Sequence, residues 1–378
     1  MTDFDLVIAG GGPVGLATAI AARQRGLSAL VIERDEGLPE KACGEGLMPG
    51  AVAALVQLGV DLAGAREFRG ITFVDQATVA SAAFPGDTGR ALPRCDLMRR
   101  LDATARQVWV TQWKGHVLRD FVYRDRVLHA EAVSRRTGRV ACTGRLLVAA
   151  DGLRSPIRRR LGLELEARGP SRFGLTRHFR CIPWSDWVEV YWHERAEVYV
   201  TPLGPEEVGV AVLMHGRIAS HDAALALFPA LLARLGASEP GRVRGAGPFE
   251  QRVHGVLAPG VALVGDAAGY LDALTGEGLA LGFRSALALV DSFASGELWR
   301  YPRQYARITR AYYATTWLML ALSRRPRLRR AVVRHLSRSP NLFSALLGLA
   351  VDSGAPLGAV VTSLFRGATP ASGRCRSF

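Results

Sequence analysis

Short apolar runs that end in glycine or in an acid recur along this chain. The first run, residues 4–9, meets a glycine-rich turn and then residues 13–25, where apolar side chains recur at helical spacing. A second apolar run, 29–32, ends at Glu33. This order predicts two buried parallel strands joined by a crossover helix.

Two later apolar runs end in the same way. Residues 146–148 lead into Asp151-Gly152, and residues 261–264 lead into Gly265-Asp266. A long apolar stretch, 279–289, then reads as a buried helix. We therefore expect a Rossmann-like domain that is assembled from distant segments of the chain.

The middle of the chain has a different amino-acid composition. Runs at 174–181, 188–192, 197–201 and 208–214 are rich in Val, Tyr, Trp and Phe, and proline and glycine separate them. These runs predict an antiparallel sheet, which a helix over 223–235 covers on one side. Alternation places Glu189, Tyr191 and His193 on one face of the sheet. Val188, Val190 and Trp192 lie on the other, and either face could meet a substrate.

The expected architecture is α/β, with a Rossmann-like nucleotide-binding domain, an inserted antiparallel β-sheet substrate domain and a C-terminal helical tail. The nucleotide-binding domain is discontinuous, over 1–70, 90–172 and 255–300. The substrate domain takes 71–89 and 173–254, and a basic helical region takes 301–378. The length of 378 residues suits about two such domains.

The first glycine-rich turn has the spacing of a dinucleotide-binding site. Gly10 permits a tight turn, Gly12 lets the backbone approach a pyrophosphate, and Gly15 lets the helix pack closely on the strand. The helix N-terminus favours the anion. Glu33, about 20 residues further on, suits a ribose hydroxyl, as in FAD or NAD rather than NADP.

The other two acid–glycine pairs favour a flavin. An NAD dehydrogenase needs only the first motif, whereas Asp266 at a strand end can hold the ribityl hydroxyls of a flavin. The turn 275–278 opens the next helix, whose N–H groups suit the flavin pyrimidine edge. Each pair alone is most often a simple turn.

The three ordered motifs resemble the flavoprotein superfamily of the aromatic hydroxylases and geranylgeranyl reductases, over residues 1 to 300. Cys43-Gly44-Glu45-Gly46 is similar to a loop of the reductase group. The segment 272–278 is similar to that group's Asp-Pro-Leu-Thr-Gly-Glu-Gly, with Ala273 in place of proline. Arg94 matches an arginine that reaches back to the cofactor. The chain also resembles a bacterial branch associated with type III polyketide synthases, which implies lipid-tailed phenols as substrates.

Motifs and resemblance together identify the candidate site. The candidate cofactor-binding residues are Gly10, Gly12, Pro13, Val14, Gly15, Glu33, Arg34, Cys43, Gly44, Arg94, Asp151, Gly152, Gly265, Asp266, Gly276, Glu277 and Gly278. Cys43 and Glu45 are the candidate catalytic residues. Cys43 also fits a buried small hydrophobe, and Glu45 or Glu277 also fits a cap of a turn or helix. No cysteine or histidine spacing suggests a metal, and His116, His178, His193 and His254 receive no role.

The net charge of +14 comes mainly from arginine. From Arg300 to Pro340 there are eleven arginines and no acidic residue, with apolar blocks at 312–322, 342–351 and 357–365. This pattern fits peripheral contact with an anionic membrane through 300–340, and equally a solvated basic face packed on the flavin domain. Nucleic acid is not expected, because no binding motif accompanies the charge. The cysteines are scattered and no apolar run is long enough to span a membrane. Both features predict a cytoplasmic protein, and peripheral contact with the membrane is compatible with them.

We expect a single-component FAD oxidoreductase for a hydrophobic small molecule. The favoured reaction is NAD(P)H-dependent monooxygenation of a phenolic or polyketide substrate. Because no nicotinamide-binding domain is evident, NADPH or NADH would visit only transiently. The alternatives are a geranylgeranyl reductase-like enzyme that saturates isoprenoid double bonds, and a flavin-binding membrane scaffold without turnover.

Overall fold

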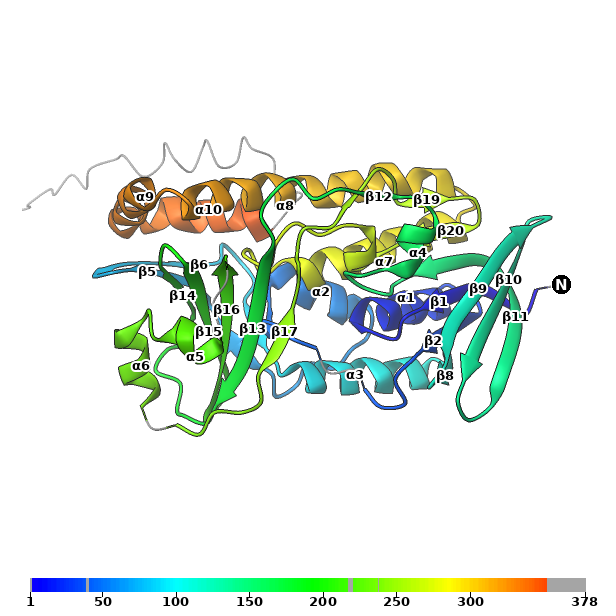
Figure 1. Cartoon of the computed structure of the whole chain (residues 1–378), viewed down its shortest axis with the longest axis horizontal. Coiled ribbons are helices and arrows are strands. Elements are labelled where there is room, and N and C mark those ends of the chain that lie inside the picture. The colour runs from blue at the N-terminus through cyan, green and yellow to red at the C-terminus, as the bar shows by residue number, and fades with distance from the viewer. Residues whose placement is uncertain (1, 39–40, 217–219, 237, 352–378) are drawn as a thin grey trace, which may run out of the picture.

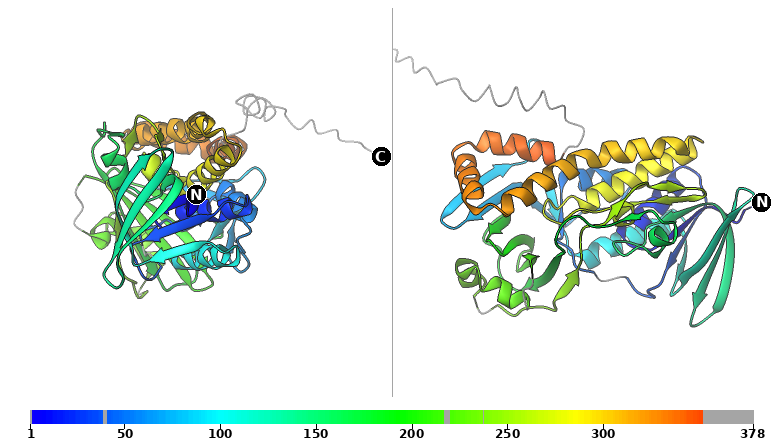
Figure 2. Two further views of the ribbon diagram at one scale, coloured as in Figure 1. Left: turned by 90° about the vertical axis from the view of Figure 1, so that its right-hand side faces the viewer. Right: turned by 45° about the horizontal axis from the view of Figure 1, so that its top comes forward.

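The computed structural model describes residues 2–38, 41–216, 220–236 and 238–351. Two large sheets lie side by side in this part of the chain, and a layer formed by the last helices runs along both (Figure 1). Figure 2 shows the same layer from two other sides. The α/β architecture expected from the sequence is confirmed.

The first sheet contains the strands that the sequence predicted to bind a nucleotide. Its central order is β19-β20-β11-β1-β2-β8, in which all neighbours from β20 to β8 are parallel. An antiparallel hairpin of β9 and β10 extends from the long strand β11. The strand bounds are β1 (Phe4–Ala9), β2 (Ala29–Glu33), β8 (Thr111–Lys114), β9 (Val117–Arg124), β10 (Val127–Ser134), β11 (Gly138–Ala149), β19 (Leu257–Ala258) and β20 (Val261–Leu263).

The crossover helix α1 (Pro13–Gln24) packs unusually close to this sheet at its first turn. A Cβ atom on Gly15 would lie 1.9 Å from the carbonyl oxygen of Gly10. Gly10 has φ +106°, and its own Cβ would lie 2.5 Å from the Ala150 oxygen. Glycine is therefore required at both positions, for backbone conformation at one and for close approach at both.

The second sheet has seven strands in the order β17-β13-β16-β15-β14-β5-β6. Its neighbours are antiparallel except for the parallel pair β14 and β5. The bounds are β5 (Gly70–Asp75), β6 (Thr78–Ala83), β13 (Arg172–Phe179), β14 (Val188–Trp192), β15 (Ala196–Gly204), β16 (Glu207–His215) and β17 (Arg244–Ala246). The sheet thus recruits a hairpin from far earlier in the chain.

The helix expected over 223–235 is wrong as a single element. The structure has two short helices, α5 (His221–Leu225) and α6 (Pro229–Leu235). Proline has no N–H group and clashes with the preceding turn, so Pro229 begins a new helix rather than continuing the first. Both helices pack against the face of β14 that carries Tyr191.

The remaining elements connect the two sheets and cover them. A small sheet of β3 (Gly46–Leu47), β7 (Gly89–Ala91) and β4 (Arg66–Phe68) packs against β15 and the helix α2 (Pro49–Gln57). The other helices are α3 (Arg94–Gln107), α4 (Pro156–Arg160), α7 (Gly278–Ala294), α8 (Tyr301–Ser323), α9 (Pro326–Arg338) and α10 (Pro340–Val351). A two-stranded pair, β12 (Glu164–Leu165) and β18 (Arg252–Val253), completes the connections. The apolar block at 357–365 lies outside the described residues.

The last helices contact both halves of the molecule. Helix α8 packs on α7 beside the first sheet, whereas α9 and α10 pack on β6 of the second. None of the helices described here combines the length and apolar character that a bilayer crossing requires.

Candidate active site

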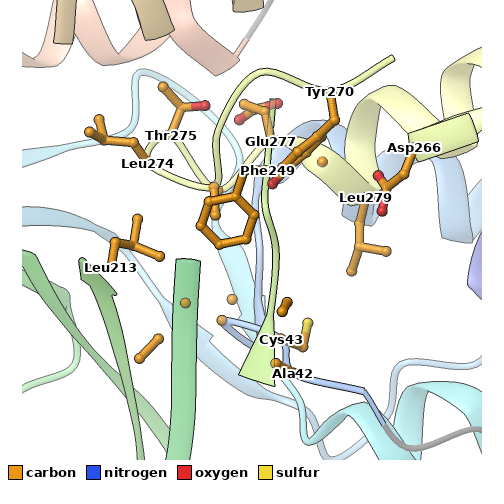
Figure 3. A pocket seen from close by; sticks show the side chains of 18 of the residues that line it. Ala42, Cys43, Leu213, Phe249, Asp266, Tyr270, Leu274, Thr275, Glu277 and Leu279 are labelled. Atoms are coloured by element: carbon orange, nitrogen blue, oxygen red, sulfur yellow. The ribbon is translucent and has the colours of Figure 1, made fainter. Parts of the chain in front are cut away.

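A cavity of about 1040 Å³ lies between the two sheets and reaches the last helices. Its lining comes from the first glycine-rich turn, from β14–β16, from the turn before α7 and from α8–α10. Figure 3 shows the middle of this cavity, where Cys43, Phe249 and Glu277 converge from three segments of the chain.

The first glycine-rich turn forms one end of the cavity. A Cβ on Gly12 would meet no atom within 4 Å, so the open space begins directly at its backbone. Glu33 lies beneath the turn, where one carboxylate oxygen accepts from Gly11 N at 2.6 Å and the other from Asp35 N at 2.9 Å. This end can therefore receive a pyrophosphate at the N-terminus of α1.

Two aspartates and two cations line the next part of the cavity. Burial raises the pKa of both Asp151 and Asp266, although Arg158 opposes that shift at each carboxyl. Arg94 and Lys41 also oppose the shift at Asp266. Burial, together with Arg94 and Arg34, lowers the pKa of Lys41. The aspartates can accept hydrogen bonds from hydroxyl groups of a ligand, and the two cations can bind its phosphates.

Glu277 lies at the start of α7, next to the left-handed Gly276. Its side chain is almost fully buried, and its Oε1 has no hydrogen-bond partner. Burial raises the pKa of Glu277 to about 8, against a smaller opposing effect of Arg284. The carboxyl is therefore largely protonated near neutral pH and faces the cavity as a neutral acid (Figure 3).

Cys43 and Glu45 lie on the loop that leads to β3. The Cys43 Sγ accepts a hydrogen bond from Glu45 N at 3.4 Å, and burial raises the pKa of the thiol. Glu45 has φ +59°, a conformation that residues other than glycine adopt rarely. One of its carboxylate oxygens accepts from Arg94 N at 2.8 Å.

The second oxygen of Glu45 contacts a residue that the sequence analysis left without a role. His178 on β13 places Nε2 2.6 Å from Glu45 Oε2 and Nδ1 2.9 Å from Glu207 Oε1. Sequence spacing gave no signal for this chain of groups, because its members come from three distant segments.

The structure brings nearly all candidate residues to one cavity. Of the residues proposed from the sequence, all line it except Gly15 and Gly265. Those two lie behind it, where Gly15 packs on Gly10 and the Gly265 backbone packs on Val14. Lys41 and Tyr270 line the cavity as well and were missed, although each lies beside a motif that was recognised.

The rest of the cavity is apolar. The face of β14 that carries Val188, Val190 and Trp192 forms the roof of the cavity, whereas the face that carries Tyr191 packs against α5 and α6. Further apolar side chains come from β4, from β5, from the residue after β6 and from the last helices, namely Phe68, Ile71, Phe73, Phe84, Met319, Val333, Leu336 and Phe343. This region fits a hydrophobic molecule.

The buried polar atoms of the cavity test whether FAD fits. Arg94 Nε, Asp151 Oδ1, Trp192 Nε1 and Glu277 Oε1 are all buried without a partner, and all belong to residues that line it. Buried polar groups in proteins are nearly always satisfied, so these atoms indicate a polar ligand. Within the described residues no group of three metal-ligating side chains comes together.

Comparison with known proteins agrees with this geometry. Residues 3–228 match the model of the FAD binding domain family. Menaquinone reductase of Mycobacterium tuberculosis is 31% identical over 327 residues, which is 78% of each chain. Squalene epoxidase of Aspergillus fumigatus is 25% identical over 75% of this chain and 65% of its own.

A solved structure supports the fold. The p-nitrophenol 4-monooxygenase of Pseudomonas putida has a TM-score of 0.79 at 19% identity, over 92% of this chain and 98% of that enzyme. The match of the family model, the relatives matched over more than three quarters of this chain and the cavity at the glycine-rich turn lead to one conclusion. The chain belongs to the FAD binding domain family and is an FAD-dependent oxidoreductase.

Proposed function

We propose that this oxidoreductase saturates a carbon–carbon double bond in a hydrophobic, isoprenoid-tailed substrate. The observation that carries the proposal is a neutral acid, Glu277, at an apolar cavity whose other end fits a dinucleotide. Bound FAD supplies hydride chemistry, and the protein supplies position and protons. The similarity to a menaquinone reductase and to a digeranylgeranylglycerophospholipid reductase supports a reductase. The loop Cys43-Gly44-Glu45-Gly46, which is similar to one of the geranylgeranyl reductase group, also supports it.

Two groups suit the proton that such a saturation consumes. Glu277 holds a proton up to about pH 8, and burial keeps the Cys43 thiol protonated to a higher pH than usual. A general acid must carry its proton at working pH and lie within reach of the substrate. Both line the cavity (Figure 3).

Monooxygenation of a phenol, the reaction favoured by the sequence analysis, is the second candidate. The similarity to squalene epoxidase supports it, because that relative is named for an oxygen-inserting reaction. The apolar roof with Trp192 also suits an aromatic ring. In both candidate reactions NADH or NADPH would reduce the flavin.

One pair of assays separates the two reactions. The reduced enzyme is mixed without oxygen with menaquinone that carries an unsaturated tail, and separately, in oxygenated buffer, with an alkylresorcinol. Our proposal predicts that the quinone tail gains two hydrogens and the phenol remains unchanged. A phenol that gains one oxygen atom, with an unchanged quinone, would establish the second candidate. If neither substrate reacts while NAD(P)H also leaves the flavin oxidised, the scaffold without turnover becomes the better description.

We also propose that the substrate enters from an anionic membrane surface through a mouth between α8, α9 and α10. Leu318, Leu328 and Leu346 line the cavity and yet are 67%, 48% and 41% exposed, so they stand at its opening. Arg324 and Arg325, between α8 and α9, and Arg327, in the first turn of α9, are all exposed. An apolar opening beside arginines suits a lipid-tailed substrate and anionic headgroups.

A further inference from the structure

The Glu45–His178–Glu207 chain is the second polar feature of the site. His178 does not line the cavity, but it lies directly behind Glu45, which does. On the other side His178 meets Glu207, whose side chain is 43% exposed at the start of β16. The three hydrogen-bonded side chains therefore connect the solvent, through one imidazole, to the cavity wall.

The geometry of this chain favours proton transfer. The two N···O distances, 2.6 Å to Glu45 and 2.9 Å to Glu207, are short, as is typical of charge-assisted hydrogen bonds. The hydrogen bond to Glu45 is the main cause that raises the pKa of His178, and Glu207 adds to it, against the effect of burial. The imidazole thus carries a proton at a higher pH than usual.

Three segments of the chain surround His178, and Arg94 bonds to Glu45 from the cavity side. The segment 43–46 presents Glu45 to the imidazole, and β16 presents Glu207. The third neighbouring segment meets His178 through its main chain, where Gly241 N donates to the His178 carbonyl at 2.8 Å. Arg177, the preceding residue on β13, bonds to Asp222 instead.

The position of Glu45 is fixed by the backbone around it. Its left-handed conformation, the bond from Arg94 N and the bond from Leu92 N to its carbonyl hold the loop in place. Gly209 lies under the carboxylate, since a Cβ there would come within 3.3 Å of Glu45 Oε2. A strained residue held by its surroundings is typical of a functional position.

We propose that Glu207, His178 and Glu45 form a proton path that supplies the cavity from solvent. The imidazolium releases its Nε2 proton to Oε2 of Glu45 and becomes neutral. Glu45 passes that proton to the cavity, and the neutral imidazole keeps its other proton on Nδ1, beside Glu207. Rotation of the partly exposed ring brings Nε2 to solvent, where it regains one proton before the ring returns to Glu45. One proton enters for each proton consumed in the cavity. The path can supply protons for either candidate reaction. Only the turnover assay described below rests on the proposed function, because it needs a substrate.

His178 is a positioning residue in this scheme, since it acts through Glu45. We would replace His178 with Gln, which keeps a polar side chain but cannot carry a proton, and Glu207 with Gln. Glu206→Gln is the matched control, because Glu206 is the exposed neighbour of Glu207. All variants are prepared as the full chain with FAD bound.

The turnover assay predicts a specific pattern. His178→Gln should lower kcat roughly 10- to 100-fold with KM little changed, and added imidazole should restore part of the rate. Glu207→Gln should shift the pH profile of kcat to lower pH, and Glu206→Gln should not. An unchanged kcat and pH profile in His178→Gln overturns the path. A loss that imidazole does not restore also overturns it, because that result indicates a structural role.

A second measurement does not need a substrate. NMR titration of the imidazole in the oxidised protein with FAD bound should give a pKa of His178 above its ordinary value of about 6.5. Glu207→Gln and Glu45→Gln should each lower it, whereas Glu206→Gln should leave it unchanged. Loss of the coupling in this titration overturns the path even if turnover is found. Intact coupling without turnover on either substrate supports the path and counts against the proposed function alone.

Discussion

Arg329 on α9 places its Nε 2.8 Å from Oδ2 of Asp75, at the end of β5, with both side chains almost fully buried. The same guanidinium donates to the carbonyls of His193 and Ser323. One arginine therefore joins the second sheet to two of the last helices, at the wall of the cavity.

We expect Arg329→Met to lower the free energy of unfolding by about 3–5 kcal/mol, because it leaves the Asp75 carboxylate buried without a partner. Arg329→Met/Asp75→Leu should recover most of this loss, since an apolar pair replaces both charges. Urea unfolding of the ligand-free protein measures both. Arg327→Met, at an exposed arginine, is the control and should change the free energy of unfolding little. If the double variant loses as much stability as Arg329→Met alone, the prediction is wrong.

Gly12→Val should abolish FAD binding without unfolding the protein. The new side chain meets no protein atom at its Cβ, so it occupies the space that a pyrophosphate needs. Gly15→Val should instead destabilise the ligand-free protein, because its Cβ would overlap the Gly10 oxygen. Flavin fluorescence titration and thermal unfolding separate the two effects. Stoichiometric FAD in Gly12→Val would refute our interpretation of the turn.

Asp266→Ala should weaken FAD binding, since the carboxyl is buried at the cavity and suits the ribityl hydroxyls. We expect the dissociation constant to rise roughly 10-fold or more, as for the loss of hydrogen bonds to a charged group. Asp291→Ala, which removes a half-exposed carboxylate that pairs with Arg25, is the control. An unchanged dissociation constant in Asp266→Ala would count against this role.

Glu277 should make the ligand-free protein less stable as pH rises. Its pKa is about 8 when folded and near 4.5 when unfolded, so the folded state binds the extra proton between these values. Binding of this proton contributes to the free energy of unfolding. The contribution is fully present below pH 4.5 and is lost as the pH rises to about 8, a loss of at most roughly 4–5 kcal/mol. Glu277→Gln should remove this slope from urea midpoints at pH 5 to 8. Parallel curves for both proteins would show that the carboxyl titrates normally.

Removal of the three exposed arginines beside the cavity mouth should weaken membrane binding. Arg324→Gln/Arg325→Gln/Arg327→Gln should bind vesicles of phosphatidylserine and phosphatidylcholine roughly 100-fold less tightly, at about 1 kcal/mol per arginine. Arg119→Gln/Arg124→Gln/Arg135→Gln removes the same charge from exposed positions on the β9–β10 hairpin and its following turn. Co-sedimentation compares the variants. Equal loss in both would assign the effect to net charge, and no binding by the wild type would leave the solvated basic face as the explanation.

Much of the cofactor site could be predicted from the sequence because its motifs are local. The spacing of Gly10, Gly12 and Gly15 depends on backbone contacts within one strand, turn and helix. Each acid at a strand end is placed by the strand that precedes it, so Asp151 and Asp266 meet wherever those strands pair in parallel. The amino-acid sequence alone therefore determined the nucleotide-binding sheet, the class of cofactor and most of the cavity's polar lining.

The tertiary structure decided the features that depend on pairing between distant segments. Glu45, His178 and Glu207 come together only through the register of β13 and β16 and the path of the loop before β3. One face of β14 meets the cavity because α5 and α6 cover the other face. The ion pair of Arg329 and Asp75 joins α9 to the second sheet. Periodicity reports which side chains share a face of one element, but not which other element covers that face, because that choice is made by packing over the whole chain.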